Sequence, residues 1–360
     1  MRIGIIGAGQ LGRMLGFAGL PLNFEFVFLD PAETPPAASA GPVIKAAFDD
    51  LEALRQLAER VDVVTFEFEN IPVDAVSSLR GVKAVYPPPE ALFFAQDRLH
   101  EKELFSELGI PVARWRTIDS IEDLRATVQQ IGLPLVLKTR RLGYDGKGQF
   151  VIRNPGDVDA AWQSLGSVPL IAEQCIDFDC EVSVIAARSI SGELAVYPLV
   201  ENRHADGILR LSSAPHDDAQ LQAMASACAE KLMTRLEYIG VLAIEFFVSG
   251  GELIANEFAP RVHNSGHWTI EGARCSQFEN HLRAICDLPL GSTATNGHCA
   301  MLNLIGEMPA TAELLRKTDC HVHDYGKAPR PGRKLGHVSL VRQGKAERDA
   351  AVVELQQLGL

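Results

Sequence analysis

Short apolar runs alternate with amphipathic stretches over the first 90 residues of the chain. Apolar runs of this length predict buried strands, and apolar positions spaced three and four apart predict helices. The alternation predicts an open parallel sheet with helices on both faces, which the three prolines at 87–89 terminate. The expected elements, in chain order, are a strand at 2–6, a helix at 10–19, a strand at 24–29, a helix at 50–59, a strand at 61–66, a helix at 73–79 and a strand at 84–86.

The pattern becomes a mixed order of strands and helices after residue 92. A charged helix is expected at 97–108 and a long helix at 220–236. Gly, Ser, Thr and Pro gather at 288–296, which predicts a boundary before a small C-terminal part. We therefore expect an α/β domain at 1–92, an α+β domain at 93–293 and a small domain at 294–360. The strands expected in the second domain lie at 133–138, 170–174, 181–186 and 194–200, with two more in a hairpin at 240–258.

The charge balance narrows the classes of partner. The chain has 360 residues and a formal net charge of −12, which argues against non-specific binding to nucleic acid or membrane surfaces. No apolar run is long enough to span a bilayer, and the short first strand does not have the form of a signal peptide. The seven cysteines include no Cys-x-x-Cys pair, so we expect reduced thiols in a cytoplasmic enzyme and no structural zinc.

Glycines at positions 7, 9 and 12 follow the first strand with the spacing typical of dinucleotide-binding folds. The second strand ends on Asp30, whose carboxylate could hold a ribose diol. The alternative is that any βαβ unit with a tight first turn needs glycines for the bend and for close helix packing. On this stretch alone the two interpretations stay open.

A second glycine-rich stretch follows the strand that ends on Lys138. Backbone N–H groups and two ammonium groups can converge there on phosphates. The stretch lacks the Gly-Lys-Ser/Thr ending of a Walker loop, and the alternative is a flexible hairpin with solvated lysines. It reads Gly143-Tyr144-Asp145-Gly146-Lys147-Gly148-Gln149.

Two carboxylates interrupt the apolar strands of the hairpin centred near Gly251. Folding about that centre sets Glu245 opposite or diagonal to Glu257, about 5–8 Å away. Carboxylates in apolar strands repel each other unless a cation joins them, and hard oxygen ligands suit Mg²⁺ on nucleotide phosphates. The alternative is that one carboxylate points to solvent from an edge strand.

The loop after the hairpin is dense in polar donors: Arg261, His263, Asn264, Ser265 and His267. Such a group suits an oxyanion or a transferring phosphoryl group. Zinc binding by the two histidines is the alternative, but no Glu follows the first histidine as in zincins.

Taken together, these motifs resemble the ATP-grasp superfamily over nearly the whole chain and, within it, the family of N5-carboxyaminoimidazole ribonucleotide synthetases. Two departures lie beside the chemistry, because Leu142 and Val262 stand where the family often has Gly and Pro. The segments that carry the resemblance are Lys138, 143–149, Glu173-Gln174-Cys175-Ile176, Glu181, Glu245, 256–267 and Arg330-Pro331-Gly332-Arg333-Lys334-Leu335-Gly336-His337.

The resemblance implies an ATP-grasp fold with an N-terminal Rossmann-like domain that binds no dinucleotide and a small C-terminal domain. It implies ATP and Mg²⁺ as cofactors and the carboxylation of 5-aminoimidazole ribonucleotide with bicarbonate, through carboxyphosphate, in purine biosynthesis. It also implies a cytoplasmic homodimer without nucleic-acid or membrane partners. An intermediate of this kind must be kept from water, which accounts for a glycine-rich lid.

The same resemblance implies roles for individual residues. Catalytic roles fall to Tyr144, Arg261, His263 and Asn264, and metal binding to Glu245 and Glu257. Substrate contacts fall to Gln10, Glu69, Ser265, Lys327, Arg333 and Lys334. A solvated loop is the alternative for the last three. Nucleotide contacts fall to Arg98, Lys138, Gly143, Tyr144, Asp145, Gly146, Lys147, Gly148, Gln149, Glu173, Gln174, Cys175, Ile176, Glu181, His204, Asn256 and Glu257.

Two other functions remain as alternatives. A formate-dependent glycinamide ribonucleotide transformylase shares the architecture, but its phosphate loop is rich in serine where this chain has Tyr144 and Asp145. An NAD(P)-dependent dehydrogenase would use the glycines at 7–12 but would leave the Glu245 and Glu257 pair unexplained.

Overall fold

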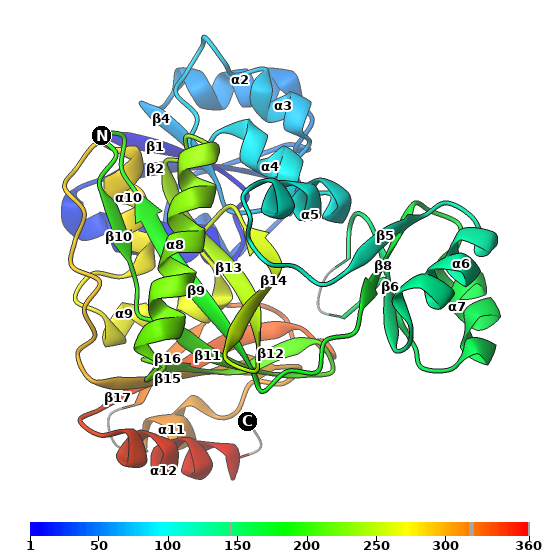
Figure 1. The fold of residues 1–360 in the computed structure, drawn as a ribbon. Helices are drawn as coiled ribbons and strands as arrows, with labels where there is room; N and C mark the ends of the chain where they lie inside the picture. Colours follow the sequence, from blue (N-terminus) through cyan, green and yellow to red (C-terminus); the bar gives the residue numbers. More distant parts are fainter. Residues whose placement is uncertain (144–145, 317–319, 359–360) are drawn as a thin grey trace.

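The structure, a computed structural model, describes residues 1–143, 146–316 and 320–358. Its strands form a four-stranded N-terminal sheet, a second four-stranded sheet and a large nine-stranded sheet. In Figure 1 the N-terminal sheet lies at the top of the body, the large sheet runs through the centre, and the second small sheet projects to one side. No helix in the described part of the chain is both long and apolar enough to cross a membrane.

The N-terminal sheet is parallel throughout, in the order β3-β2-β1-β4, as expected. Ile3 and Ile5 of β1 pack toward α1, whereas Ile6 packs toward α2 on the other face, so helices cover both faces. The strand expected at 84–86 is wrong, because Val85 makes only an isolated bridge to Val64. The elements are β1 (Arg2–Ile6), α1 (Gln10–Gly19), η1 (Leu20–Leu22), β2 (Glu25–Asp30), η2 (Pro36–Ser39), β3 (Val43–Lys45), α2 (Leu51–Glu59), β4 (Val63–Phe66) and α3 (Val73–Ser77).

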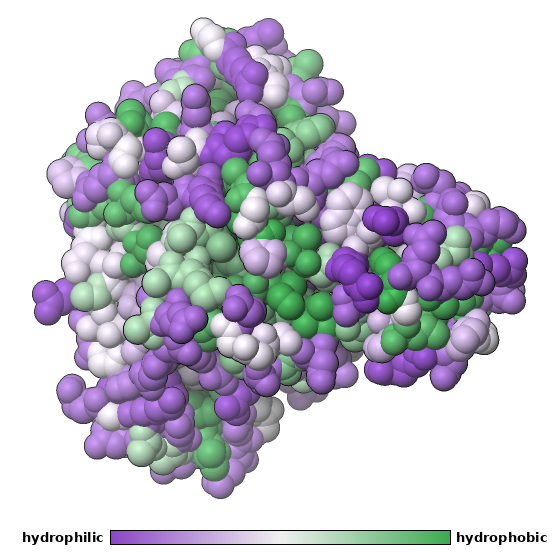
Figure 2. All heavy atoms as spheres, viewed as in Figure 1, coloured by the Kyte–Doolittle hydropathy of each residue, from purple (hydrophilic) through white to green (hydrophobic). Residues whose placement is uncertain are grey.

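The projecting sheet has the order β5-β8-β6-β7 and is antiparallel. Alternate residues such as Leu135 and Leu137 form a core with α6 and α7, which leaves Val136 and Lys138 on the opposite face. Hydrophobic side chains gather on the body beside this unit (Figure 2). Its elements are β5 (Trp115–Ile118), α6 (Ile121–Ile131), β6 (Leu135–Thr139), β7 (Gln149–Ile152), η3 (Pro155–Asp157), α7 (Val158–Leu165) and β8 (Leu170–Gln174).

The large sheet has the order β14-β13-β9-β11-β12-β15-β17-β16, and β10 pairs with β9. The strand expected at 194–200 is two strands, β10 and β11. β15 pairs with β12, so one continuous sheet crosses the boundary expected near 293; the domain division itself stays a prediction. The strands are β9 (Cys180–Arg188), β10 (Leu194–Val196), β11 (Val200–Ala205), β12 (Ile208–Ala214), β13 (Gly240–Ser249), β14 (Glu252–Ala259), β15 (His298–Ile305), β16 (Cys320–Asp324) and β17 (Lys334–Arg342).

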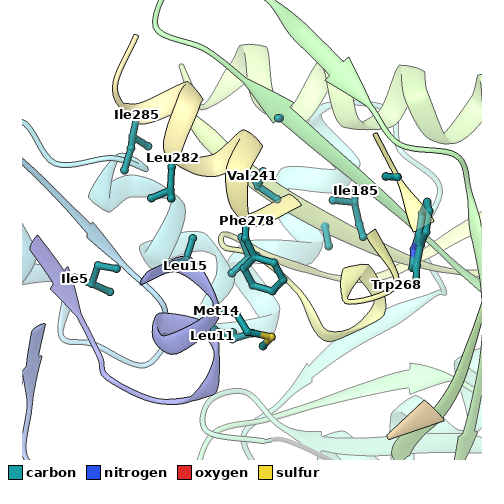
Figure 3. Packing of buried hydrophobic residues seen from close by; sticks show 14 of the residues in the cluster. Ile5, Leu11, Met14, Leu15, Ile185, Val241, Trp268, Phe278, Leu282 and Ile285 are labelled. Carbon is teal, nitrogen blue, oxygen red and sulfur yellow. The ribbon is translucent and has the colours of Figure 1, made fainter. Parts of the chain in front are cut away.

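Helix α10 fastens the N-terminal sheet to the large sheet. Phe278 and Leu282 of α10 lie between Leu15 of α1 and Val241 of β13 in one hydrophobic cluster (Figure 3). Burying such side chains contributes about 1.5–3 kcal/mol each, so this cluster helps to hold the N-terminal sheet against the large sheet. The remaining helices are α4 (Pro89–Ala95), α5 (Arg98–Glu107), α8 (Ala219–Arg235), η4 (Asn264–Gly266), α9 (Thr269–Gly272), α10 (Gln277–Ile285), α11 (Thr311–Leu315) and α12 (Lys345–Gln356).

Candidate active site

A cavity of about 990 Å³ opens between the three sheets, and most residues singled out from the sequence line it. Gly148, Ser265, Lys327 and Arg333 do not line it, and Tyr144 and Asp145 lie outside the described residues. The predicted residues on its wall are Gln10, Glu69, Arg98, Lys138, Gly143, Gly146, Lys147, Gln149, Glu173, Gln174, Cys175, Ile176, Glu181, His204, Glu245, Asn256, Glu257, Arg261, His263, Asn264 and Lys334.

The two hairpin carboxylates face each other as predicted. Glu245 of β13 is the register partner of Glu257 of β14, and the ladder shifts immediately after Glu245. Burial and the charge of Glu257 raise the pKa of Glu245 to about 7. Burial opposes ionisation of Glu257 too, but Arg98, whose Nη1 lies 3.1 Å from Glu257 Oε2, helps to hold that pKa below its usual value. The pair therefore concentrates negative charge that a cation would relieve.

The donor set at this pair fits Mg²⁺. Two opposed carboxylates supply hard oxygen ligands, and phosphate oxygens of a nucleotide could complete the coordination. The neighbouring Asn256 Oδ1 is buried without a hydrogen-bond partner among the described residues, which marks it as a further free oxygen. No group of three or more His, Cys, Asp and Glu side chains in residues 1–143, 146–316 and 320–358 is arranged to bind a metal by itself. A metal ion at this pair would therefore need further oxygen ligands from another molecule.

A buried ion-pair cluster lies at the cavity wall around Glu173. Glu173 Oε1 is 3.1 Å from Lys138 Nζ, and Glu173 Oε2 is 3.3 Å from Lys102 Nζ. Burial disfavours the Glu173 carboxylate, but the two ammonium groups bring its pKa down to about 2. Lys102 also donates to the carbonyls of Ala255 (3.3 Å) and Asn256 (2.7 Å). It thereby ties the strand that carries Glu257 to the strand that carries Glu173.

The role of Lys102 was not predicted from the sequence, because a lysine in a charged helix usually lies on a solvated face. Its neighbour Glu101 was missed for the same reason. Glu101 is buried, accepts the backbone N–H of Phe258 at 2.7 Å, and burial raises its pKa to about 8. The partners of both residues lie more than 70 positions further along the chain, so no local signal marks them.

The polar loop after β14 is brought to the carboxylate pair. Arg261 forms an ion pair with Glu69, and His263 Nε2 lies 3.3 Å from Glu245 Oε1. Burial and then the charge of Arg261 lower the pKa of His263 well below its usual value, so the imidazole is neutral near pH 7. Asn264 exchanges two amide hydrogen bonds of 3.0 and 2.7 Å with Asn303 of β15. The loop is therefore held in place from several strands.

Ser265 is buried behind His263 and off the cavity wall. Its Oγ lies 2.9 Å from His263 Nδ1. The direct substrate contact predicted for Ser265 is therefore not what this arrangement provides, because the hydroxyl faces the imidazole. At this position Ser265 can instead orient the imidazole ring of His263.

Another part of the cavity wall carries groups suited to a nucleoside. Glu181 Oε2 lies within hydrogen-bond distance of His204 Nδ1, at 2.8 Å. Burial lowers the pKa of His204, but this hydrogen bond and the negative charges of Glu245 and Glu181 together raise it above its usual value. Phe178 and Phe247 stack with ring centroids 4.8 Å apart, and both line the cavity. Neither aromatic residue was singled out from the sequence, because single phenylalanines are common in any core.

Four described residues of the second glycine-rich stretch line the cavity, namely Gly143, Gly146, Lys147 and Gln149, and the local backbone explains the glycines. Gly146 and Gly148 have φ of 75° and 72°, and a Cβ on Gly148 would lie 2.6 Å from Thr139 Oγ1. Leu142 has φ of 62°, a conformation that costs a non-glycine residue about 1–2 kcal/mol. This explains why glycine suits position 142.

The first glycine turn is closed by carboxylates of the protein itself. Glu67 accepts the N–H of Gly9 at 2.7 Å and of Gly12 at 3.3 Å, and Asp30 accepts the N–H of Ala8 at 2.8 Å. These are the donors that a dinucleotide pyrophosphate uses in a Rossmann site. The role of Glu67 was not predicted from the sequence. Its carboxylate accepts the N–H groups that an external anion would otherwise bind, so the glycines have a structural role in this turn.

The basic C-terminal segment reaches this part of the cavity. Lys334 lines the cavity, and Lys327 Nζ contacts the side chain of Gln10. Burial and the charge of Arg333 lower the pKa of Lys327 to about 8. Arg333 itself donates to the carbonyl of Ala328 at 3.1 Å and stands off the cavity wall. Two of the three predicted cations thus lie at or near the cavity.

Comparison with protein families gives matches over nearly the whole chain. Residues 1–96 match the ribonucleotide synthetase preATP-grasp domain, residues 103–278 the ATP-grasp domain, and residues 299–351 the phosphoribosylaminoimidazole carboxylase C-terminal domain. The match to an ATP-grasp domain covers the projecting sheet, which carries Lys138 and Glu173, and the hairpin, which carries Glu245 and Glu257.

Curated relatives and solved structures agree with these matches. The chain is 54% identical to the N5-carboxyaminoimidazole ribonucleotide synthase of Pseudomonas aeruginosa over 99% of each chain. The Thermus thermophilus synthetase structure has a TM-score of 0.95 at 51% identity, covering 99% of this chain and 98% of that one. The Aspergillus clavatus synthase, solved in complex with ADP and 5-aminoimidazole ribonucleotide, has a TM-score of 0.92 at 32% identity, covering 99% and 98%.

Proposed function

This chain belongs to the family of N5-carboxyaminoimidazole ribonucleotide synthases, and we propose how its cavity carries out their reaction. The enzyme is an ATP-grasp ligase of purine biosynthesis. ATP passes its γ-phosphoryl group to bicarbonate, which gives carboxyphosphate and ADP. The exocyclic amine of 5-aminoimidazole ribonucleotide then either attacks the carboxyl carbon and displaces phosphate, or attacks CO₂ after carboxyphosphate has released phosphate. On both routes the amine loses a proton as the new N–C bond forms. The product is N5-carboxyaminoimidazole ribonucleotide.

The observation that carries this proposal is the facing pair Glu245 and Glu257 beside the buried cations Lys138 and Arg98. We assign the triphosphate to this junction, with backbone donors from the second glycine-rich stretch, whose residues Gly143, Gly146, Lys147 and Gln149 line the same cavity. Mg²⁺ held by the two carboxylates would neutralise charge on the phosphate oxygens during transfer. The ribose would lie at Glu181 and the adenine along 173–176, beside the Phe178 and Phe247 stack.

The acceptor side of the reaction falls to the loop after β14. The Arg261 guanidinium and the neutral His263 can hold bicarbonate and its phosphorylated form beside Glu245. A side cavity of about 80 Å³, lined by Arg98, Arg140 and Arg261, adjoins this place. Enclosure matters here because water would hydrolyse carboxyphosphate before the amine arrives. Glu69 stands beside Arg261, where it can contact the ribonucleotide.

The ribonucleotide occupies the part of the cavity next to the first glycine turn in this proposal. Gln10 and Lys334 line that part, and Lys327 contacts Gln10. A protein of net charge −12 repels a phosphate on average, so local ammonium groups must overcome that field. We assign Lys327 and Lys334 to the 5′-phosphate, and Arg333 to the support of the loop that carries Lys327.

A homodimer in the cytoplasm completes the proposal. The seven cysteines, all free in the structure, suit a reducing compartment.

The deciding assay measures ADP release with and without 5-aminoimidazole ribonucleotide and bicarbonate. We expect full turnover only with both, together with formation of the carboxylated nucleotide. ADP formation that ignores both substrates would contradict the proposed reaction.

A further inference from the structure

A side-chain amide holds the reacting loop from behind the cavity wall. Gln277, the first residue of α10, is fully buried and does not line the cavity. Its Oε1 accepts the backbone N–H of His263 at 2.9 Å, and its Nε2 donates to the carbonyl of the same residue at 2.6 Å. One amide thus satisfies both backbone groups of His263.

The two hydrogen bonds from Gln277 take the place of strand pairing, which the loop lacks. His263 lies beyond the end of β14, so no neighbouring strand can bond its peptide groups. Gly266 provides the space, because a Cβ there would lie 2.5 Å from Gln277 Oε1. The backbone N–H of Gln277 donates to Thr269 Oγ1 at 3.0 Å, and that hydroxyl donates to the carbonyl of Gly266 at 2.6 Å. Helix α10 is therefore joined to both ends of the turn.

The position of the His263 backbone decides where its imidazole points. Nδ1 accepts the N–H of Ser265 at 3.3 Å, which leaves the ring proton on Nε2. Nε2 lies 3.3 Å from Glu245 Oε1, at the cavity wall. A shift of the backbone would move this N–H away from the place where the phosphoryl group is transferred, and losses of about 100-fold are known for 1 Å displacements of reacting groups.

We propose that Gln277 is a positioning residue for the carboxylation reaction, which acts by fixing the peptide of His263 so that the imidazole N–H meets the reacting groups beside Glu245. The inference rests on the proposed function for the identity of those groups. It adds a residue outside the cavity, on the helix that also joins the two large parts of the body.

The same helix supplies a matched control. Asn280 is also fully buried, and its amide grips one residue in the same way, accepting the N–H of Gly291 at 2.7 Å and donating to its carbonyl at 3.1 Å. It donates in addition to the Tyr197 hydroxyl at 2.7 Å. Asn280 does not line the cavity, and Gly291 belongs to the stretch before β15. Its removal costs at least as many hydrogen bonds without touching the reacting loop.

The test compares Gln277→Met with Asn280→Leu, because both replace the amide by an apolar chain of similar size. For Gln277→Met we expect kcat for the carboxylated product to fall tenfold or more. KM for ATP should stay within twofold, and ADP released without product should increase. For Asn280→Leu we expect a similar or larger drop in Tm but a kcat of the folded enzyme within twofold of the original. Gln277→Glu, whose acid form keeps one donor and one acceptor, should restore part of kcat.

A folded Gln277→Met enzyme with unchanged kcat and unchanged coupling of ADP to product would overturn the inference. If that variant is not recovered folded, Gln277→Glu and Asn280→Asp replace the pair, and equal kcat values in these two would overturn it as well. The unsubstituted enzyme separates the two levels of the argument. If it forms no carboxylated nucleotide, the proposed function fails; if it does and Gln277 variants match it, only the role of Gln277 fails.

Discussion

Glu245 and Glu257 are register partners across the β13–β14 hairpin, with their carboxylates on the wall of one cavity. Burial and the charge of Glu257 raise the pKa of Glu245, so the two groups are fully ionised together at neutral pH only when a cation joins them. We therefore expect Glu257→Gln to abolish Mg-nucleotide turnover, because the loss of one anionic ligand costs several kcal/mol of transition-state stabilisation. Steady-state ADP release at millimolar Mg²⁺ measures this.

Glu252→Gln at the exposed end of the same hairpin is the control, and it should keep normal turnover. Far-UV circular dichroism and Tm should show that both variants fold. A folded Glu257→Gln enzyme with normal ADP release would show that the metal site lies elsewhere.

The first glycine turn leads to a second prediction. The N–H groups of Gly9 and Gly12 bond to Glu67, so neither NAD⁺ nor NADP⁺ has donors for its pyrophosphate there. Displacing a buried, bonded carboxylate costs more than one new charged bond returns. Calorimetric titration of both cofactors should show no saturable binding at micromolar concentration. Saturable binding that Gly9→Val abolishes would instead support a dehydrogenase.

The carboxylate pair was predictable because its geometry is local. A Ser-Gly-Gly turn between two apolar strands fixes the hairpin register, and the register sets Glu245 against Glu257. Lys138 was predictable for a similar reason, since it ends a strand that leads into glycines. The parallel N-terminal sheet followed from the regular alternation of short apolar runs with stretches whose apolar positions are spaced three and four apart.

Lys102, Glu67 and Gln277 were not predictable because their roles depend on partners far along the chain. Lys102 lies in helix α5, whose charged pattern also suits a solvated face. Its partner Glu173 lies in strand β8 of the projecting sheet. Glu67 meets the glycine turn only after β1 and β4 pair. The continuation of the large sheet into β15 and β17 likewise depends on non-local pairing, which no local composition records.

A third prediction concerns pH and the joint between the two large parts. His281 of α10 is buried, its Nδ1 accepts the N–H of Val241 at 3.1 Å, and its Nε2 lies 2.8 Å from Thr65 Oγ1. Burial lowers the pKa of His281 to about 3. The unfolded chain takes up this proton near pH 6.5, so the stabilisation is complete above that pH and is lost as pH falls toward 3.

One such proton changes the free energy of unfolding by up to about 1.4 kcal/mol per pH unit. We expect Tm to decrease on acidification from pH 7 to pH 5 more steeply in the unsubstituted protein than in His281→Gln. His321→Gln, at an exposed position, should leave the slope unchanged. Equal slopes in the unsubstituted protein and His281→Gln would show that other groups control the acid sensitivity.

The last prediction separates the cations of the C-terminal segment. Lys334 lines the cavity, whereas Arg333 stands off its wall and donates to the carbonyl of Ala328, in the loop that carries Lys327. If the 5′-phosphate of the ribonucleotide lies at this segment, Lys334→Ala should raise the KM for 5-aminoimidazole ribonucleotide roughly tenfold or more, equivalent to about 1.4 kcal/mol of lost binding. Arg333→Ala should raise it less, because its effect passes through the loop. KM for ATP should change little in either variant.

The control substrate is the nucleoside without its phosphate, whose weak turnover should be indifferent to both substitutions. If Lys334→Ala instead raises the KM for ATP and spares the ribonucleotide, the segment serves the triphosphate, and the ribonucleotide must be placed elsewhere in the cavity.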